Sequence, residues 1–389
     1  MTSPDVLARR DPDGADFPGR RLMERLFGFA TLGILALGFA QGVAAIATPQ
    51  AQRRLAEVLG LDAFLAGRTA AAVNHVMAHD LPADPLLRAA GGVLRWKIFG
   101  AGSAQVLPGC DDWLFLAEEI RPWPGAEAAM AERAGLVGAV AQRLAREGIA
   151  LRVAVVPDKA RMVAAQRCGV PYAAQAAARL PAFLAALAAQ RIETVDIAAA
   201  FGTEGAALYY RTDTHWNQEG ARRAAAAIAA ALPRDLPREG EFRTETAPAE
   251  TDGPGDLLRL MSLDHVPDWL RPRPDRQRVE TTSPTEAADA GSILDDAPVP
   301  PVVLIGSSFS VNANFHGALQ QAAGLKVTNL ALAGGGFARA AAAYVTSPAW
   351  RETPPRLVVW EMPERVLGQP IGADEAALRA WLETQASVR

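Results

Sequence analysis

An uninterrupted apolar run near the N-terminus constrains this chain more than any other feature. From Phe27 to Ala47 the sequence has 21 residues with no charged side chain and a single Gln. At about 1.5 Å of rise per residue, a helix over this run is about 30 Å long, which matches the hydrocarbon core of a bilayer. Only Arg53 and Arg54 follow the run closely, and more arginines precede it, at Arg9, Arg10, Arg20, Arg21 and Arg25. This bias predicts a membrane-spanning helix with its N-terminus inside and the bulk of the chain beyond the membrane.

The apolar run has two other interpretations besides a membrane anchor. A buried core helix is rarely apolar over so many consecutive residues. A cleavable signal peptide is also compatible, because Ala45-Ile46-Ala47 fits an A-x-A cleavage site. The long leader and the length of the run favour an uncleaved anchor. We therefore expect a cytoplasmic leader over 1–26, a single-pass inner-membrane anchor over 27–47, and a catalytic domain in the periplasm.

Composition excludes several classes of protein. Half of the 389 residues are hydrophobic, so the chain can bury a sizeable core. The net charge of −4 is opposite to the basic excess of a nucleic-acid binder, and we expect no nucleic-acid partner. Two cysteines, Cys110 and Cys168, are too few for a disulfide scaffold or a multi-cysteine metal centre. They could form one bridge in an oxidising compartment, which their spacing alone does not decide.

The rest of the chain alternates short apolar runs with alanine-rich helical stretches. Residues 48–95 read as a helical stalk, and residues 96–389 as the main domain. Five runs, rich in Val, Ile or Leu, are typical of strands buried on both faces of a parallel sheet: Leu151–Val156, Ile192–Ile197, Val302–Ile305, Lys326–Leu330 and Leu357–Trp360. Helices are expected over Ala126–Glu147, Tyr172–Gln190, Gln218–Leu232, Phe309–Ala323 and Phe337–Val345. This order predicts a doubly wound α/β fold with a parallel sheet.

The alternating pattern breaks between residues 233 and 301. This stretch is rich in Pro, Asp, Glu and Arg and has little periodicity. A loop of this length inside a compact domain is usually functional or disordered. We expect an excursion that lies near the rim of an active site.

A serine follows one of the predicted buried strands. The strand Val302–Ile305 leads into Gly306, Ser307 and Ser308, and a helix is expected to follow. Ligands of open α/β sheets bind at the carboxyl ends of the strands. Ser308 at a helix N-terminus would have unpaired amides and the helix dipole to stabilise an oxyanion. A simple helix cap is the alternative role for a serine in this place.

A second polar segment, Tyr209 to Asn217, contains an Asp two residues before a His. A neutral His215 can accept the proton of a serine hydroxyl, and Asp213 can orient the imidazole and stabilise its cation. Alone, the pair also fits a polar surface loop. Together with the serine segment it favours a nucleophilic Ser–His–Asp arrangement.

The other histidines are weaker candidates for the base. His316 lies eight residues after Ser308, about 12 Å along a continuous helix. His265 lies in the proline-rich excursion and could reach the serine only by loop folding. His75 and His79 have the i,i+4 spacing of metal ligands, but no third ligand is indicated, so we expect no metal site.

A glycine run follows the predicted strand Lys326–Leu330. Gly334, Gly335 and the preceding Asn329 are candidates for oxyanion or substrate contacts, because glycine allows a ligand to approach backbone amides closely. A tight turn explains the run equally well. The G-x-G-x-x-G spacing of dinucleotide sites is absent, and we expect no cofactor.

These segments together resemble the alginate O-acetyltransferase family, an SGNH-hydrolase-like group of periplasmic enzymes that acetylate exopolysaccharides. The resemblance extends over about 260 residues in the order of the family. Its matching pieces are Gly109–Phe115, Val155–Lys159, Thr212–Trp216, Gly255–Leu258, Gly306–Ser310 and Val359–Arg365. Thr212–Trp216 (TDTHW) and Gly306–Ser310 (GSSFS) are the most specific.

The resemblance implies a triad of Ser308, His215 and Asp213. The Asp-x-His pair precedes the serine, the reverse of ordinary SGNH esterases, so the domain is expected to be circularly permuted. Ser307, Cys110 and Asp112 depart from the residues usual in the family at their positions. Asp158, Lys159, Glu361 and Arg365 follow strand ends and are candidates to line the cleft, but we favour salt bridges in the core or at the rim as their role.

The resemblance further implies an acetyl-enzyme on Ser308 from which a hydroxyl of an exported polysaccharide takes the acetyl group. A multispanning membrane acyltransferase is the expected supplier of acetyl groups, with no acetyl-CoA site outside the cytoplasm. Trp216, Tyr210, Arg211 and Trp269 are candidate substrate contacts, although core packing is the alternative for the aromatic side chains. A carbohydrate acetyl esterase and a non-catalytic scaffold of an export complex are the alternative functions.

Overall fold

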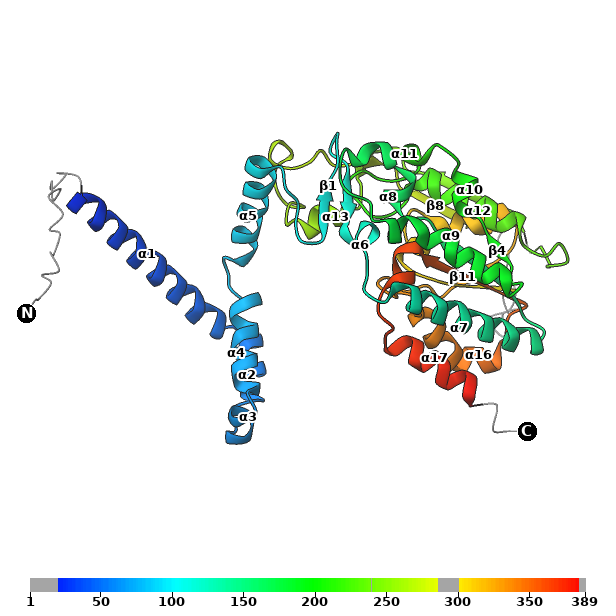
Figure 1. The fold of residues 1–389 in the computed structure, drawn as a ribbon, viewed down its shortest axis with the longest axis horizontal. Coiled ribbons are helices and arrows are strands. Elements are labelled where there is room, and N and C mark those ends of the chain that lie inside the picture. The colour runs from blue at the N-terminus through cyan, green and yellow to red at the C-terminus, as the bar shows by residue number, and fades with distance from the viewer. Residues whose placement is uncertain (1–19, 239, 286–300, 385–389) are drawn as a thin grey trace, which may run out of the picture. The chain divides into compact units, whose positions relative to one another are not determined.

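The computed structural model describes residues 20–238, 240–285 and 301–384 (Figure 1). Contacts divide the chain into two units, one up to Ala90 and one from Gly91. The division falls within helix α5 (Asp84–Phe99).

The first unit consists of the apolar helix and short helices that follow it. Helix α1 (Arg20–Ile46) contains a stretch from Leu22 to Ile46 that is long and apolar enough to cross a membrane, and most of that stretch is exposed. The helices that follow are α2 (Pro49–Ala56), α3 (Leu61–Leu65) and α4 (Arg68–His79). Ala45 at the end of α1 is buried together with Ala51 and Val76. The exposed apolar surface agrees with the predicted single-pass anchor.

A five-stranded parallel sheet forms the centre of the second unit. Its order is β10-β9-β11-β3-β4, where the strands are β10 (Val327–Asn329), β9 (Val302–Ile305), β11 (Leu357–Pro363), β3 (Ala150–Val156) and β4 (Thr194–Val195). All five predicted strands are present, so the parallel α/β fold is confirmed. Numbered from β9, the order becomes 2-1-3-4-5, a doubly wound order. The chain therefore enters this sheet at its fourth strand, as the expected circular permutation requires.

Both faces of the sheet are covered, which explains why the strand sequences are apolar without alternation. Val153 and Val155 belong to one core cluster, whereas Ala154 and Val156 belong to the other. The first cluster includes residues of α7 (Ala126–Arg146), α9 (Ala174–Ala189), α15 (Arg339–Thr346), α16 (Pro348–Glu352) and α17 (Ala373–Glu383). The second includes residues of α8 (Lys159–Met162), α10 (Ile197–Phe201), α11 (Gly205–Leu208), α12 (Gln218–Ala230) and α14 (Phe315–Ala323).

The predicted excursion over 233–301 contains small antiparallel ribbons in its described part. Strand β5 (Phe242–Thr246) pairs with β8 (Glu280–Pro284), and β6 (Thr251–Asp252) pairs with β7 (Arg276–Gln277). Residues 286–300 of the excursion lie outside the described residues. The remaining elements are β1 (Val106–Pro108), β2 (Leu114–Leu116), α6 (Ala117–Ile120), η1 (Ala164–Arg167), α13 (Asp256–Leu260), η2 (Asp268–Leu270), η3 (Ser308–Ser310) and η4 (Glu364–Gly368).

One predicted helix is wrong over its first turns. The expected helix Phe309–Ala323 is a single turn, η3, followed by a break before α14. Ala313 and Asn314 have φ values of 54° and 55°, in the left-handed region that ends a right-handed helix. Ser308 therefore does not lie at the N-terminus of a long helix, and the expected contribution of a helix dipole at this serine is removed.

Candidate active site

The serine turn is held by a buried carboxylate from the neighbouring strand. Glu361 on β11 accepts hydrogen bonds from the Ser307 amide (2.7 Å), the Ser307 hydroxyl (2.9 Å) and the Ser310 hydroxyl (2.8 Å). A Cβ atom at Gly306 would lie 2.5 Å from the same carboxylate, so only glycine fits there. Burial raises the pKa of the Glu361 carboxyl, and the hydrogen bonds from the two serines oppose that rise. The turn is thus shaped by a partner 54 residues away in sequence.

Ser308, His215 and Asp213 form a continuous hydrogen-bonded chain. The Ser308 Oγ atom lies 2.7 Å from His215 Nε2, and His215 Nδ1 lies 2.6 Å from Asp213 Oδ1. Ser308 follows β9, and the His215 loop precedes α12, so the two segments converge from positions 93 residues apart. With its proton on Nδ1, the imidazole presents Nε2 as the acceptor for the serine hydroxyl.

The surroundings of Asp213 favour the charged form of its carboxylate. Burial by itself would raise the pKa of Asp213, but the hydrogen bond and charge of His215 and the amides of Asp256 and His215 lower it to about 2. The Asp256 amide donates to Asp213 Oδ2 at 2.7 Å, so each Asp213 oxygen has a donor. A carboxylate held in this way stabilises an imidazolium when His215 receives a proton.

The sequence profile described as "SGNH hydrolase-like domain, acetyltransferase AlgX" matches residues 106–364. The chain belongs to this family. It is 35% identical over 312 residues to the "Probable alginate O-acetylase AlgJ" of Pseudomonas putida, covering 78% of this chain and 81% of that protein. The AlgJ of Pseudomonas aeruginosa is 32% identical over 296 residues, with 72% and 74% covered. The solved structure of the "O-Acetyltransferase Domain of Pseudomonas putida AlgJ" matches with a TM-score of 0.62 and 32% identity, covering 72% of this chain and 99% of that one.

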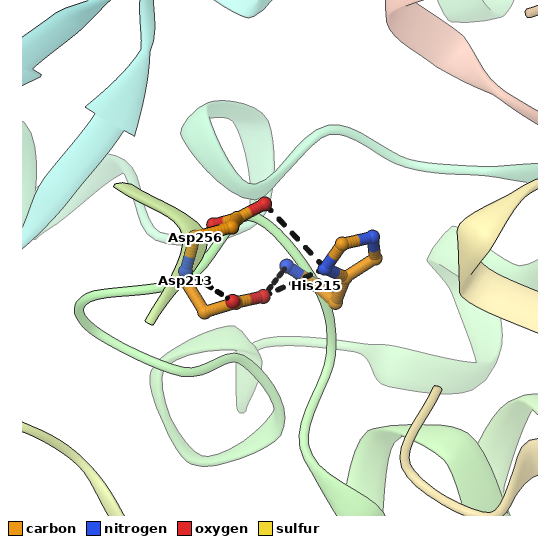
Figure 2. Close-up of side chains that lie close together, drawn as sticks. All are labelled: Asp213, His215 and Asp256. Carbon is orange, nitrogen blue, oxygen red and sulfur yellow. Dashed lines mark hydrogen bonds and ion pairs between the residues drawn. The ribbon is translucent and has the colours of Figure 1, made fainter. Parts of the chain in front are cut away.

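Asp256 is a second carboxylate at this AlgX-type site, and its role was not identified from sequence. Its Oδ2 atom lies 3.7 Å from His215 Nδ1, and its Oδ1 accepts the Thr214 amide at 2.7 Å. Figure 2 shows both carboxylates beside the Nδ1 edge of the imidazole. Burial and the Asp213 charge raise the pKa of Asp256, whereas His215 and the Thr214 amide lower it. The Gly255–Leu258 piece of the family pattern was the one sequence signal for this residue.

Asp213, His215 and Asp256 also form the only group of three or more potential metal-ligating side chains that are close together in the described residues. Their mutual hydrogen bonds explain this proximity, because the Nδ1 atom that would bind a cation is already shared with Asp213. His75 and His79, the earlier candidates, have ring centroids 4.6 Å apart and belong to no such group.

Two further side chains, Lys159 and Asp275, form hydrogen bonds with the backbone of the loop that carries His215. The fully buried ammonium of Lys159 donates to the carbonyls of Asp213 (2.7 Å), Tyr210 (3.3 Å) and Arg211 (3.3 Å). Burial lowers the pKa of Lys159, and nearby carboxylates raise it. Asp275 accepts the Thr212 amide and hydroxyl, each at 2.7 Å. Asp256 and Asp275 both belong to the excursion, so this later part of the sequence supports the loop that carries His215.

The salt bridges expected at the strand ends form only in part. Asp158 pairs with buried Arg179 at 3.1 Å, as expected. For Glu361 and Lys159 the expectation is wrong, because the former binds the serine turn and the latter binds backbone carbonyls. Arg365 lies over the Phe309 ring, 5.4 Å from its centroid, rather than in an ion pair within the described residues.

The glycine run lies beside the serine turn, as predicted, but only some of its backbone amides lack a hydrogen-bond acceptor. The Leu332 amide donates to the Gly306 carbonyl at 3.0 Å. The Gly335 amide is used within the run, by Leu332, and the Asn329 side chain donates to the Ser310 carbonyl at 2.9 Å. Gly335 and Asn329 are therefore structural in this arrangement. The amides of Gly334 and Ser308 have no hydrogen-bond acceptor in the described part of the chain, so neither amide is used by the fold there.

Three expected substrate contacts are occupied elsewhere. Trp216 is fully buried and packs against Phe309 and Phe315, so it cannot meet a sugar. The hydroxyl of buried Tyr210 lies 2.9 Å from Gln218 Oε1 and 2.5 Å from Gln277 Oε1.

Arg211, the third, is held by Asp275 at 3.4 Å. Trp269, the remaining candidate for a substrate contact, is 73% exposed, unlike the buried aromatic side chains of Trp216 and Tyr210. Of the competing bases, His316 binds the Val327 carbonyl at 2.7 Å and His265 is almost fully exposed beside Asp264.

The cysteines are joined in a disulfide, which sequence spacing had left open. Cys110 and Cys168 have Cα atoms 5.6 Å apart and are separated by 58 residues. The bridge ties the β1–β2 connection to the end of η1. Asp112, one of the departures from the family pattern, has a φ of 64° in the left-handed region. Aspartate tolerates this conformation better than most residues, which explains how the turn survives.

Proposed function

We propose that this chain is a membrane-anchored O-acetyltransferase that acetylates hydroxyl groups of an exported polysaccharide through an acetyl-enzyme on Ser308. The observation that carries the proposal is the hydrogen-bonded chain from Ser308 through His215 to Asp213, at 2.7 Å and 2.6 Å. These distances match those at which a nucleophile and its base work. Relatives named alginate O-acetylases support a polysaccharide as the acceptor.

In the first half of the reaction, His215 Nε2 takes the proton of Ser308 as the serine oxygen attacks the carbonyl carbon of an acetyl donor. The resulting oxyanion is stabilised by the free amides of Ser308 and Gly334. When the bond to the leaving group breaks, His215 returns the proton to that group, and acetyl-Ser308 remains.

The second half repeats these steps with a sugar hydroxyl. His215 takes the hydroxyl proton, the sugar oxygen attacks the acetyl carbonyl, and Ser308 leaves and regains its proton from His215. Asp213, with its lowered pKa, stays charged and balances the imidazolium in both halves. Water competes with the sugar as the acceptor, so transfer depends on the positioning of the sugar.

The reaction is proposed to take place in the periplasm. The arginine-rich leader and the apolar helix support an N-terminus in the cytoplasm and a catalytic unit beyond the membrane. The Cys110–Cys168 disulfide supports the same side, because such bonds persist in oxidising compartments. Since acetyl donors are made inside the cell, we infer that a multispanning membrane acyltransferase passes acetyl groups to this site.

The test uses the full chain in detergent with an aryl acetate as donor and an oligosaccharide as acceptor. Mass spectrometry of the sugar is expected to show acetylation by the wild type and a loss of several orders of magnitude with Ser308→Ala. Ser283→Ala changes an exposed serine on β8 and is the matched control. Release of free acetate without acetylated sugar would identify an esterase, and undiminished transfer by Ser308→Ala would refute the serine mechanism.

A further inference from the structure

We propose that Asp256 is a positioning residue for the catalytic base, which holds the Asp213–His215 pair in place and adds a second negative charge beside the imidazole. The inference rests on the proposed function, because it assigns Asp256 a role in the proton transfers between Ser308 and His215. Asp256 lies 43 residues after Asp213, at the start of α13. The inference therefore gives the excursion a part in the chemistry.

Asp256 and the loop that carries His215 hold each other by two hydrogen bonds in opposite directions. The Asp256 amide donates to Asp213 Oδ2 at 2.7 Å, and Asp256 Oδ1 accepts the Thr214 amide at 2.7 Å. Gly255, with a φ of 59° in the left-handed region, turns the chain immediately before these contacts. The first bond fixes the Asp213 carboxylate, and the second fixes the peptide that follows it. The orientation of the carboxylate that binds His215 Nδ1 therefore depends on Asp256.

The second oxygen of Asp256 faces the same edge of the imidazole as Asp213 (Figure 2). Asp256 Oδ2 lies 3.7 Å from His215 Nδ1, which is long for a hydrogen bond but short for an interaction between charges. Its side chain is 29% exposed, so water screens part of that interaction. Among the described residues, Asp213 and Asp256 are the two carboxylates within ion-pair distance of His215. An ionised Asp256 therefore stabilises the imidazolium that forms in each half of the reaction.

Two cations near the imidazole act in the opposite sense. Lys159 on α8 donates to the Asp213 carbonyl at 2.7 Å. Arg365 on η4 lies 5.4 Å from the centroid of the Phe309 ring, and the His215 ring is 4.8 Å from the same centroid. Both cations disfavour a further positive charge on the imidazole. A second carboxylate offsets part of this effect.

The other carboxylates around the site are committed elsewhere. Glu361 on β11 binds the serine turn, and Asp275 binds the backbone at the start of the loop that carries His215. Burial and the charge of Asp213 raise the pKa of Asp256, whereas His215 lowers it. A proton on His215 therefore favours the ionised form of Asp256, which is the form that stabilises the imidazolium.

The test separates the charge of Asp256 from its hydrogen bonds. Asp256→Asn keeps the backbone amide and an oxygen acceptor for Thr214 but has no charge, whereas Asp256→Ala also loses the acceptor. The full chain is assayed in detergent with the aryl acetate and the oligosaccharide between about pH 5 and 9. Asp235→Asn is the matched control, because Asp235 pairs with exposed Arg356 at 3.0 Å. Arg356 precedes β11, at the edge of the sheet opposite to the serine turn.

For Asp256→Asn we expect kcat to fall about tenfold and KM for the donor to stay unchanged, because the lost charge acts only once the proton has moved. The acidic limb of the kcat/KM profile should move to lower pH by about one unit, since the base becomes harder to protonate. Asp256→Ala should show the same shift and a lower kcat, because the Thr214 amide is released. Asp235→Asn should match the wild type in both measurements. A merely structural role would lower kcat without moving the limb.

The pH profile of Asp256→Asn decides the inference. An acidic limb at the wild-type position, or one moved to higher pH, would overturn it whether or not kcat had fallen. Undiminished transfer by Ser308→Ala would instead refute the proposed function. Dependence on Ser308 without a shift in Asp256→Asn would refute this inference alone.

Discussion

The carboxylate of Glu361 is expected to determine the activity of a serine that it does not touch. It accepts hydrogen bonds from three donors of the serine turn, and it is 1% exposed. Glu361→Ala leaves those donors without a partner, and each buried unpaired donor costs about 1–3 kcal/mol. Because the three losses are not fully additive, we expect the free energy of unfolding to fall by about 3–6 kcal/mol. Glu361→Gln retains an acceptor for the Ser307 amide and costs about 1 kcal/mol.

The effect on catalysis follows from the geometry of the turn. Ser308 lies 2.7 Å from its base, and displacement of a reacting group by about 1 Å can cost about 100-fold in rate. We therefore expect kcat for acetyl transfer to fall about 100-fold in Glu361→Ala, and KM for the donor to change little. In Glu361→Gln we expect kcat to stay within about fivefold of the wild type. A purely structural role would affect stability in both variants and leave kcat per folded molecule unchanged.

The assay combines denaturant unfolding with steady-state kinetics on the folded fraction. Glu132→Ala is the control, because Glu132 forms an exposed ion pair with Arg379 and such pairs contribute about 0–1 kcal/mol. A folded Glu361→Ala protein with wild-type kcat would refute the reasoning that this carboxylate aligns the nucleophile.

Three other predictions concern the charge network and the disulfide. Asp213 has its pKa lowered from 3.8 to about 2, so its contribution to stability is complete above pH 3.8 and is lost as the pH falls through 2. The unfolding free energy of the wild type should therefore exceed that of Asp213→Asn by about 2 kcal/mol more at pH 6 than at pH 2, measured by urea titration; a difference independent of pH would contradict this. Lys159→Met removes the donor to three loop carbonyls but also the cost of a buried ammonium, so we expect kcat to fall about tenfold with little change in unfolding free energy. A Lys159→Met enzyme with wild-type kcat would show that the loop holds its shape unaided. Cys110→Ser opens a loop of 58 residues and should lower the unfolding free energy by about 4 kcal/mol. Reduction of the wild type should produce the same loss in thermal or urea unfolding, and an unchanged stability would argue against the bridge in solution.

Much of the fold could be predicted because its signals are local. The strand Val302–Ile305 was predicted with its observed bounds, and the helix over Ala126–Glu147 differs by one residue. An apolar run bounded by turn residues, or an alanine-rich stretch of helical length, carries this information within itself. The helix after Ser308 failed because its break depends on left-handed backbone at Ala313 and Asn314, two residues with no glycine to indicate it.

The site was predicted less evenly, for a different reason. The Asp-x-His segment and the serine after a strand mark their own chemistry, so Asp213, His215 and Ser308 could be named from residue type and position. Trp216 shows the limit of such reasoning, because an aromatic residue beside a histidine has the same sequence whether it faces a substrate or the core. Its burial is decided by Phe309 and Phe315, which are distant in the chain.

By itself, the sequence determined the membrane-length helix, the order of strands and helices, and the residues that we propose for acyl transfer, since each is encoded by neighbours along the chain. The tertiary structure alone decided that Ser308 and His215 meet across 93 residues and that Asp256, Asp275, Lys159 and Glu361 support them. It also decided that the two cysteines are bonded. Hydrogen-bond partners and burial depend on contacts between segments far apart in sequence, and these distances exist only once the sheet has assembled.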